Sequence, residues 1–180
     1  MALTQSAISM TLRISKTLMV VAIALFTSLV AFNNITDYFT NLAFIRHVLL
    51  MDTIFPSSRN MYRAISSPIL HHVAYVCIIT LETVTAVLCW MGGNRLWSAR
   101  HDSHMAFQRA KGFTIAGLTL GFLTWQVAFM SIGGEWFGMW MSKQWNGMPD
   151  AFRFFITILS VLIFVSQDND ALDKHERPGL

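Results

Sequence analysis

Four long apolar stretches constrain the fold of this chain more than any other feature of its sequence. They cover about residues 12–32, 68–91, 112–132 and 149–166, and most of the charged residues lie between them. A helix needs about 20 mainly apolar residues to cross the hydrocarbon core of a bilayer, so each stretch can form one span. The chain is 54% hydrophobic and 13% charged, whereas soluble domains contain about 25% charged residues. We therefore predict a single all-α membrane domain, a four-transmembrane-helix bundle.

The connecting segments predict how the spans alternate across the membrane. Segments 33–67 and 133–148 fall on one side, and the loop 92–111 and the tail 167–180 fall on the other. With both termini in the cytoplasm, eight Lys and Arg residues lie inside and five outside, which agrees with the positive-inside rule. The first span is expected to remain uncleaved, because Leu29 stands where a signal-peptide cleavage site needs a small residue.

Segment 33–67 is too polar at its centre to form a fifth span. Arg46, His47 and Asp52 interrupt its apolar residues, and charged groups in the middle of a membrane are costly. We predict that this segment forms a partly helical cap over the outer end of the bundle.

Polar residues form a stripe along the second predicted span. At about 100° per residue, six side chains stay within about 40° of one line: His71, Tyr75, Ile78, Glu82, Thr85 and Cys89. A polar stripe in a membrane helix faces protein or water rather than lipid. The third span carries a stripe of small residues in which Gly117 and Gly121 form a GxxxG step, and such steps let helix backbones approach closely. We predict that the two spans pack along these stripes.

Glu82 is the most informative residue of the polar stripe, because it lies deep in its span. At a similar depth the other spans offer hydroxyl groups but no Lys or Arg: Thr27, Ser28, Thr124, Thr157 and Ser160. An ionised carboxylate without a cation is costly there, so we expect a protonated Glu82 that bonds to these hydroxyls. Its role is either structural or that of a site for a proton, a cation or a quinone or lipid head group. The candidate intramembrane polar site comprises Glu82, His71, Tyr75, Thr85 and Thr124.

The segment before the fourth span combines aromatic and charged residues. Trp136, Trp140 and Trp145 are interleaved there with Glu135 and Lys143. Tryptophan favours the membrane–water interface, because its ring is apolar while its N–H needs a hydrogen-bond acceptor. We predict that the three tryptophans form an interfacial aromatic surface on the outer face. This surface either anchors the protein or contacts a lipid, a quinone or a partner.

The sequence does not favour catalysis, a cofactor or nucleic acid. It contains no nucleotide-binding loop and no nucleophile beside a base, so we assign no catalytic residue. Haem is not expected, because three of the four predicted spans lack histidine. His101 and His104 are too few ligands for a metal site and are expected on a solvated surface. The net charge of +3 is small and scattered, which argues against nucleic-acid binding.

Several unusual sequence words resemble those of a bacterial family. They are FNNITDY (32–38), MDTIFP (51–56), GGEWFGMW (133–140), WNG (145–147) and AFRF (151–154). Over about residues 13–170 the chain resembles a family catalogued as predicted small integral membrane proteins of unknown function, domain of unknown function 2165. The resemblance implies a four-span protein of the bacterial inner membrane and brings no catalytic residues.

Two functions remain open from the sequence. The first is an accessory or scaffolding subunit that packs against a larger membrane complex through its small-residue and aromatic surfaces. The alternative is a small carrier or ligand-binding bundle that uses the Glu82 stripe. A bundle of four spans is small for a monomeric transporter, which favours the accessory subunit. In both cases the lipid bilayer is the expected surrounding.

Overall fold

The protein is a bundle of long helices in the computed structural model, which describes residues 2–171. Four helices are long and apolar enough to cross a membrane: α1 (Ala2–Thr36), α3 (Pro68–Ser98), α5 (Gly112–Leu123) with its continuation η3 (Thr124–Trp136), and α6 (Met148–Ser166). Shorter helices connect them: α2 (Tyr38–Leu50), η1 (Arg59–Arg63), η2 (Ala99–His101), α4 (His104–Ala110) and η4 (Met139–Met141). No strand occurs in the described residues. The predicted all-α four-helix membrane bundle is confirmed.

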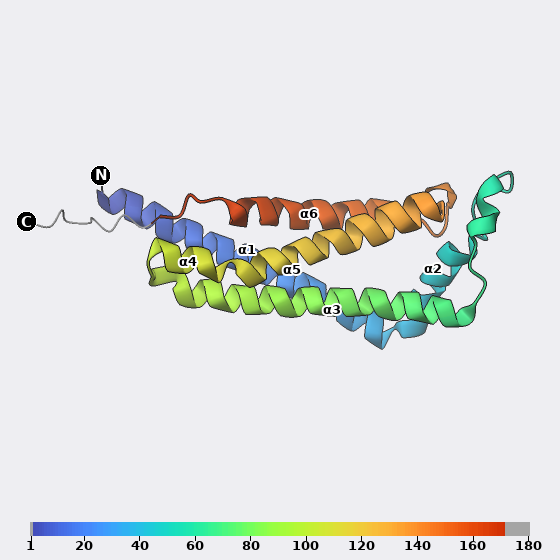
Figure 1. Ribbon diagram of the computed structural model, residues 1–180, viewed down its shortest axis with the longest axis horizontal. Coiled ribbons are helices and arrows are strands. Elements are labelled where there is room, and N and C mark those ends of the chain that lie inside the picture. Colours follow the sequence, from blue (N-terminus) through green and yellow to red (C-terminus); the bar gives the residue numbers. More distant parts are fainter. Residues whose placement is uncertain (1, 172–180) are drawn as a thin grey trace, which may run out of the picture.

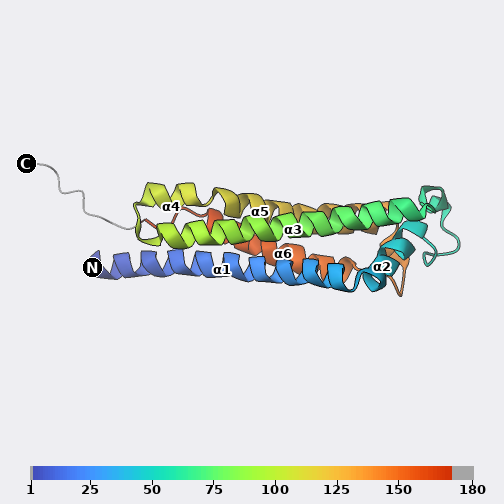
Figure 2. The same ribbon diagram turned by 90° about the horizontal axis from the view of Figure 1, so that it is seen from below.

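The long helices lie side by side along the long axis of the molecule (Figures 1 and 2). α1 packs along α3, α3 packs along α5, and α5 with η3 packs along α6. The contact between α6 and α1 is much less extensive. The bundle is therefore tightly packed at three of its helix pairs and loose along the seam between α1 and α6.

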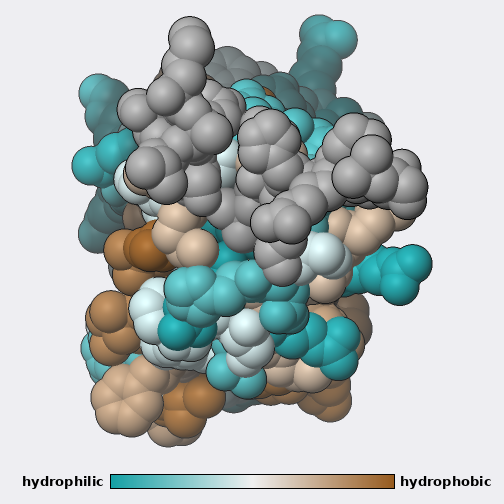
Figure 3. Space-filling model, turned by 90° about the vertical axis from the view of Figure 1, so that its left-hand side faces the viewer, coloured by the Kyte–Doolittle hydropathy of each residue, from teal (hydrophilic) through white to brown (hydrophobic). Residues whose placement is uncertain are grey.

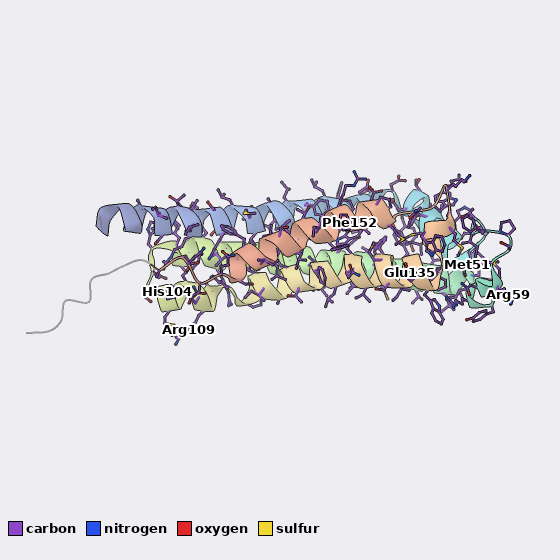
Figure 4. The ribbon with its side chains drawn as sticks, turned by 90° about the horizontal axis from the view of Figure 1, so that it is seen from above. Met51, Arg59, His104, Arg109, Glu135 and Phe152 are labelled. Atoms are coloured by element: carbon purple, nitrogen blue, oxygen red, sulfur yellow. The ribbon has the colours of Figure 1, made fainter. Side chains whose placement is uncertain are left out.

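The two ends of the bundle differ. α2, η1 and η4 lie at one end, which we name the cap end (Figure 1). α4, η2 and residues 167–171 lie at the opposite end, which we name the Asp170 end. Figure 4 shows Arg59 and Glu135 at the cap end and His104 and Arg109 at the Asp170 end. The start of α1 and the end of α6 both lie at the Asp170 end, as four crossings require.

Three of the long helices extend beyond their predicted bounds. α1 continues to Thr36 instead of ending near residue 32, and η3 carries the third span to Trp136 instead of residue 132. α3 continues past its predicted end near residue 91, through Gly92–Asn94, to Ser98. The spans are therefore longer, and their connections shorter, than the sequence pattern indicates.

α3 continues through Gly92 and Gly93, and at both positions the missing side chain lets a neighbouring helix pack closely against α3. A Cβ atom added to Gly92 would lie 2.6 Å from the backbone nitrogen of Thr114 in α5. One added to Gly93 would lie 2.9 Å from Cγ2 of Val21 in α1. Both neighbouring helices thus approach α3 at this pair, where a larger side chain would not fit.

The GxxxG step of the third span lies in the same contact between α3 and α5. A Cβ added to Gly117 would lie 2.9 Å from Cys89 Sγ, and one added to Gly121 would lie 3.0 Å from Thr85 Cγ2. Cys89 and Thr85 are buried residues of the polar stripe. The small residues of α5 are therefore covered by α3, within the bundle.

The second half of the third span is a π-helix, which the sequence did not indicate. η3 covers 13 residues, although most π-helical segments are single turns. Its wider turn is seen where the Phe137 N–H donates to the carbonyl oxygen of Ile132, five residues earlier, at 3.0 Å. This segment supplies Trp125 and Phe129 to the wall of a cavity.

Candidate functional site

Glu82 lies in the interior of the bundle near the middle of α3. Glu82 is 2% exposed to solvent. The Asn34 Nδ2 group of α1 donates a hydrogen bond to Glu82 Oε2 at 2.7 Å. Glu82 Oε1 has no hydrogen-bond partner within the described residues. The Tyr75 hydroxyl, two turns earlier on α3, donates to the backbone oxygen of Asn34 at 2.9 Å, so it holds Asn34 in place.

A cavity of about 450 Å³ adjoins this carboxyl group. Its walls come from α1, α2, α3, η3 and the first turns of α6. Six of the lining side chains are aromatic: Phe26, Phe44, Tyr75, Trp125, Phe129 and Phe154. Five are polar: Asn33, Asn34, Asn41, Glu82 and Asp150. The result is an aromatic-walled space lined by two carboxyl groups and three amides.

Two further cavities adjoin this one. A space of about 310 Å³ continues along the seam between α1 and α6 and shares Phe26 and Phe154 with it. An apolar space of about 180 Å³ lies toward the cap end. It shares four side chains with the Glu82 cavity: Phe44, Ile45, Ile78 and Phe129. A molecule bound near Glu82 could therefore place an apolar part in either direction.

The structure brings together only part of the predicted polar site. Tyr75 and Glu82 line the cavity. His71 is buried nearer the cap end, where its Nε2 lies 2.7 Å from a backbone oxygen of the segment before α3. Thr85 and Thr124 each donate their hydroxyl to the carbonyl four residues earlier in the same helix. Those three residues are buried but do not line the cavity.

The predicted hydroxyl partners of Glu82 are wrong. Each of the five hydroxyls donates to a carbonyl of its own helix: Thr27, Ser28, Thr124, Thr157 and Ser160. Ser and Thr side chains commonly make such bonds inside helices. The partner is Asn34, which lay beyond the predicted end of the first span. Asn34 belongs to the FNNITDY sequence word, the one signal that could have indicated it.

The three predicted interfacial tryptophans all lie at the cap end, but in two different settings. Trp136 and Trp140 are 52% and 51% exposed. Trp145 is half-buried, and its ring stacks on His47 of α2 with 4.4 Å between centroids. Arg63 covers Trp136, with its guanidinium carbon 4.6 Å from the ring centroid. The aromatic surface is therefore partly built into the folded cap.

A second polar cluster lies at the Asp170 end, where the sequence predicted a tail. Asp170 is fully buried, and its Oδ2 lies 2.6 Å from Lys16 Nζ and 3.2 Å from Lys111 Nζ. Arg13 Nε donates to the backbone oxygen of Asp170 at 3.0 Å. Arg13, Lys16 and Lys111 are all buried. From the sequence they are counted among the charges of the inner face.

Residues 167–171 therefore pack against the end of the bundle instead of extending from it as a free tail. Lys16 Nζ also donates to the backbone oxygen of Gln167 at 2.6 Å, and Lys111 Nζ donates to the same oxygen at 3.0 Å. Burial by itself raises the pKa of Asp170, but the hydrogen bond from Lys16 and the charge of Lys111 outweigh it and hold the pKa below its ordinary value. The rest of the predicted tail, residues 172–180, lies outside the described residues.

His104 belongs to this cluster rather than to a solvated surface. It is half-buried, and its Nε2 lies 2.8 Å from Asp168 Oδ1. His104, Asp168 and Asp170 offer three metal-ligating groups within 4.8 Å of one another. Two lysines already share the Asp170 carboxylate, so a metal ion would bind against their charge. The arrangement favours ion pairing that holds residues 167–171. Figure 3 shows this end, where hydrophilic residues gather between apolar flanks.

Comparison with known proteins agrees with the architecture described above. The model of one family, described as predicted small integral membrane protein (DUF2165), matches residues 12–168. That range includes most of α1, all of the other long helices and every residue that lines the Glu82 cavity. No curated protein and no solved structure matches the chain. The chain therefore belongs to the family of predicted small integral membrane proteins (DUF2165).

Proposed function

We propose that the protein binds a small bilayer-soluble molecule in the Glu82 cavity, as a carrier or a ligand-binding bundle. The observation that carries this proposal is the state of the carboxyl group. Glu82 Oε2 is bonded to Asn34, whereas Oε1 is buried beside a cavity without a partner among the described residues. An unsatisfied buried polar atom costs about 1–3 kcal/mol, and ionisable residues inside membrane helices commonly mark ligand or ion sites.

The position of the cavity supports a ligand that arrives from the bilayer. The cavity lies along the loose seam between α1 and α6, on the side of the bundle that would face lipid. Leu29, one of its lining residues, is 59% exposed. A molecule dissolved in the membrane can enter between these helices without passing through the cap.

Labelling with dicyclohexylcarbodiimide tests this access. This apolar reagent partitions into bilayers and forms a stable acylurea with carboxyl groups that it can reach. We expect labelling at Glu82 in protein reconstituted into lipid nanodiscs, located by mass spectrometry of peptides. Asp170 is the internal control, because it is fully buried beneath two lysines and should remain unlabelled.

A matched pair of variants connects the labelling to the cavity. Ile78→Phe adds bulk to a side chain that lines both the Glu82 cavity and its apolar extension, so labelling should slow several-fold. Val76→Phe makes the same kind of change on the exposed side of α3, where Val76 is 50% exposed, and should leave the rate unchanged. No labelling of Glu82, or equal rates in the two variants, would contradict the proposal.

An accessory subunit is the second candidate, supported by the half-exposed Trp136 and Trp140 at the cap end. The other feature expected of such a subunit, a small-residue contact surface, is not found at Gly117 and Gly121, because α3 covers both residues. Gentle purification tests this candidate. Stoichiometric recovery of other membrane subunits would support it, and a Trp136→Ala, Trp140→Ala double variant should then lose them.

We also propose that the protein lies in the bacterial inner membrane with both termini in the cytoplasm. The excess of Lys and Arg at the Asp170 end supports this orientation. A reporter that is active only in the cytoplasm, fused after Leu180, should be active. A stable but inactive fusion, together with activity of the same reporter inserted after Ser57 in the cap, would contradict this orientation and indicate the opposite one.

A further inference from the structure

We infer that the ligand of the Glu82 cavity is a protonated amine with an apolar body. This inference rests on the proposed function and adds the chemical class of the ligand. Electrostatics supply the first argument. Glu82 and Asp150 both line the cavity, and no Lys or Arg is among its lining residues in the described chain. Arg153, paired with Asp150, has a side chain that is 71% exposed. The cavity therefore favours a cation over an anion.

The hydrogen bonds at Glu82 supply the second argument. Asn34 already donates to Oε2, so the carboxylate needs one more donor, at Oε1. A protonated amine donates an N–H and carries the balancing charge, which makes a stronger bond than a neutral donor. A quinone carbonyl would bring only an acceptor to this position. A bound amine supplies the cation that an ionised Glu82 lacks, whereas a quinone carbonyl would accept from the protonated acid and leave Glu82 uncharged. The two ligands therefore differ in the charge state of Glu82 in the complex.

The aromatic wall supplies the third argument. Organic ammonium groups bind to the faces of Trp, Tyr and Phe rings through cation–π interactions. Trp125 and Phe154 pack at 4.7 Å between centroids, and Trp125 and Phe129 at 4.8 Å. All three line the cavity together with Tyr75. A cavity that combines these rings with the buried Glu82 carboxyl group suits a cation that keeps few of its water molecules.

The apolar extension indicates what the rest of the ligand is. The space of about 180 Å³ toward the cap end is lined mainly by aliphatic and aromatic side chains. It meets the Glu82 cavity at Ile78 and Phe129. An amine held at Glu82 can therefore place an alkyl or aryl group there. This body would also let the ligand partition into the bilayer before it enters.

Equilibrium binding to the protein in lipid nanodiscs tests the ligand class. The probes are radiolabelled dodecylamine, which is protonated at neutral pH, and dodecanol, which has the same chain and no charge. Binding is measured above that of empty nanodiscs. Wild type should bind one dodecylamine at least about tenfold more tightly than dodecanol, the difference between a charge-assisted and a neutral hydrogen bond.

Two variants of Glu82 test whether its charge determines the amine affinity. Glu82→Gln can still bond to Asn34 but cannot be charged, so dodecylamine affinity should fall about tenfold while dodecanol affinity stays the same. Glu82→Asp keeps the charge and should keep most of the amine affinity. Saturating N,N-dimethyldodecylamine, which is protonated at neutral pH and cannot form an amide with an activated carboxyl group, should also protect Glu82 from carbodiimide in the wild type. The wild-type comparison of the two probes needs no variant, so a misfolded variant does not prevent the test.

Equal wild-type affinity for the two probes, or unchanged dodecylamine affinity in Glu82→Gln, would overturn the amine assignment. If Glu82 is still labelled by carbodiimide in that case, the cavity is accessible and only the ligand class is wrong. Absence of labelling would overturn the proposed function itself.

Discussion

Replacing Asp170 with alanine should lower the free energy of unfolding by about 3–5 kcal/mol. The substitution leaves Lys16 and Lys111 buried at the end of the bundle without the carboxylate that balances their charges. An uncompensated charge in a buried position is costly, because neither water nor a counter-charge stabilises it. Titration with sodium dodecyl sulfate in dodecylmaltoside micelles, followed by circular dichroism, measures the loss.

Asp150→Ala is the matched control for this prediction. Asp150 also pairs with a cation, Arg153, but the two side chains are 58% and 71% exposed. Exposed ion pairs contribute about 0–1 kcal/mol, so this variant should be nearly as stable as the wild type. Equal losses in the two variants would contradict the view that Asp170 clamps residues 167–171 onto the helix ends.

The same cluster predicts the direction of the pH dependence. Burial raises the pKa of Asp170, but its two lysine partners lower it more, so the folded-state pKa lies below the ordinary value. A carboxyl group of this kind stabilises the fold fully above its unfolded-state pKa of about 4 and loses that contribution as the pH falls through the lower folded-state pKa. Below about pH 4, the stability of the wild type should therefore fall more steeply than that of Asp170→Asn.

The long helices could be predicted because a membrane span must meet its requirements within one segment. Length and apolarity are properties of the local sequence, since lipid offers no partners for backbone groups. The inward direction of Tyr75 and Glu82 could be predicted for a similar reason, because helical periodicity does not depend on the neighbouring helices. Both residues are buried in the structure.

The partner of Glu82 could not be predicted, because it depends on how far one helix reaches past another. Ending the first span near residue 32 placed Thr27 and Ser28 beside Glu82. The observed α1 continues to Thr36, which adds four residues, or about 6 Å of helix, and brings Asn34 to the carboxylate. An error of one helical turn at the end of a span therefore changed the predicted chemistry of the site.

The Asp170 cluster could not be predicted for a different reason. Arg13 and Lys16 lie near the end of a span, where the positive-inside pattern already explains them. Only the path of residues 167–171, more than 150 residues later, brings both cations to Asp170. Arg13 donates there to the backbone oxygen and Lys16 to the carboxylate. The local sequence carries no sign of that path. For η3 likewise, no known sequence signal distinguishes a long π-helix from an α-helix.

Replacing Gly92 with alanine should destabilise the bundle by about 3 kcal/mol, the upper part of the range for overpacked interiors. The added Cβ would lie 2.6 Å from the backbone nitrogen of Thr114 and 2.8 Å from its Cα. Backbone atoms cannot move aside as the end of a flexible side chain can. The change would therefore push α3 away from α5 along the interface that also holds Gly117 and Gly121.

Gly112→Ala makes the identical chemical change where it should do no harm. A Cβ at Gly112 would meet no atom within 4 Å, and alanine favours the helix over glycine by up to about 1 kcal/mol. This variant should be as stable as the wild type or slightly more stable, in the same detergent titration. If the two variants lost equal stability, a general intolerance of change, rather than the contact with Thr114, would explain the loss. A loss confined to Gly92→Ala would instead locate it in the close approach of α3 and α5, because Gly92 and Gly112 differ mainly in what faces the added methyl group.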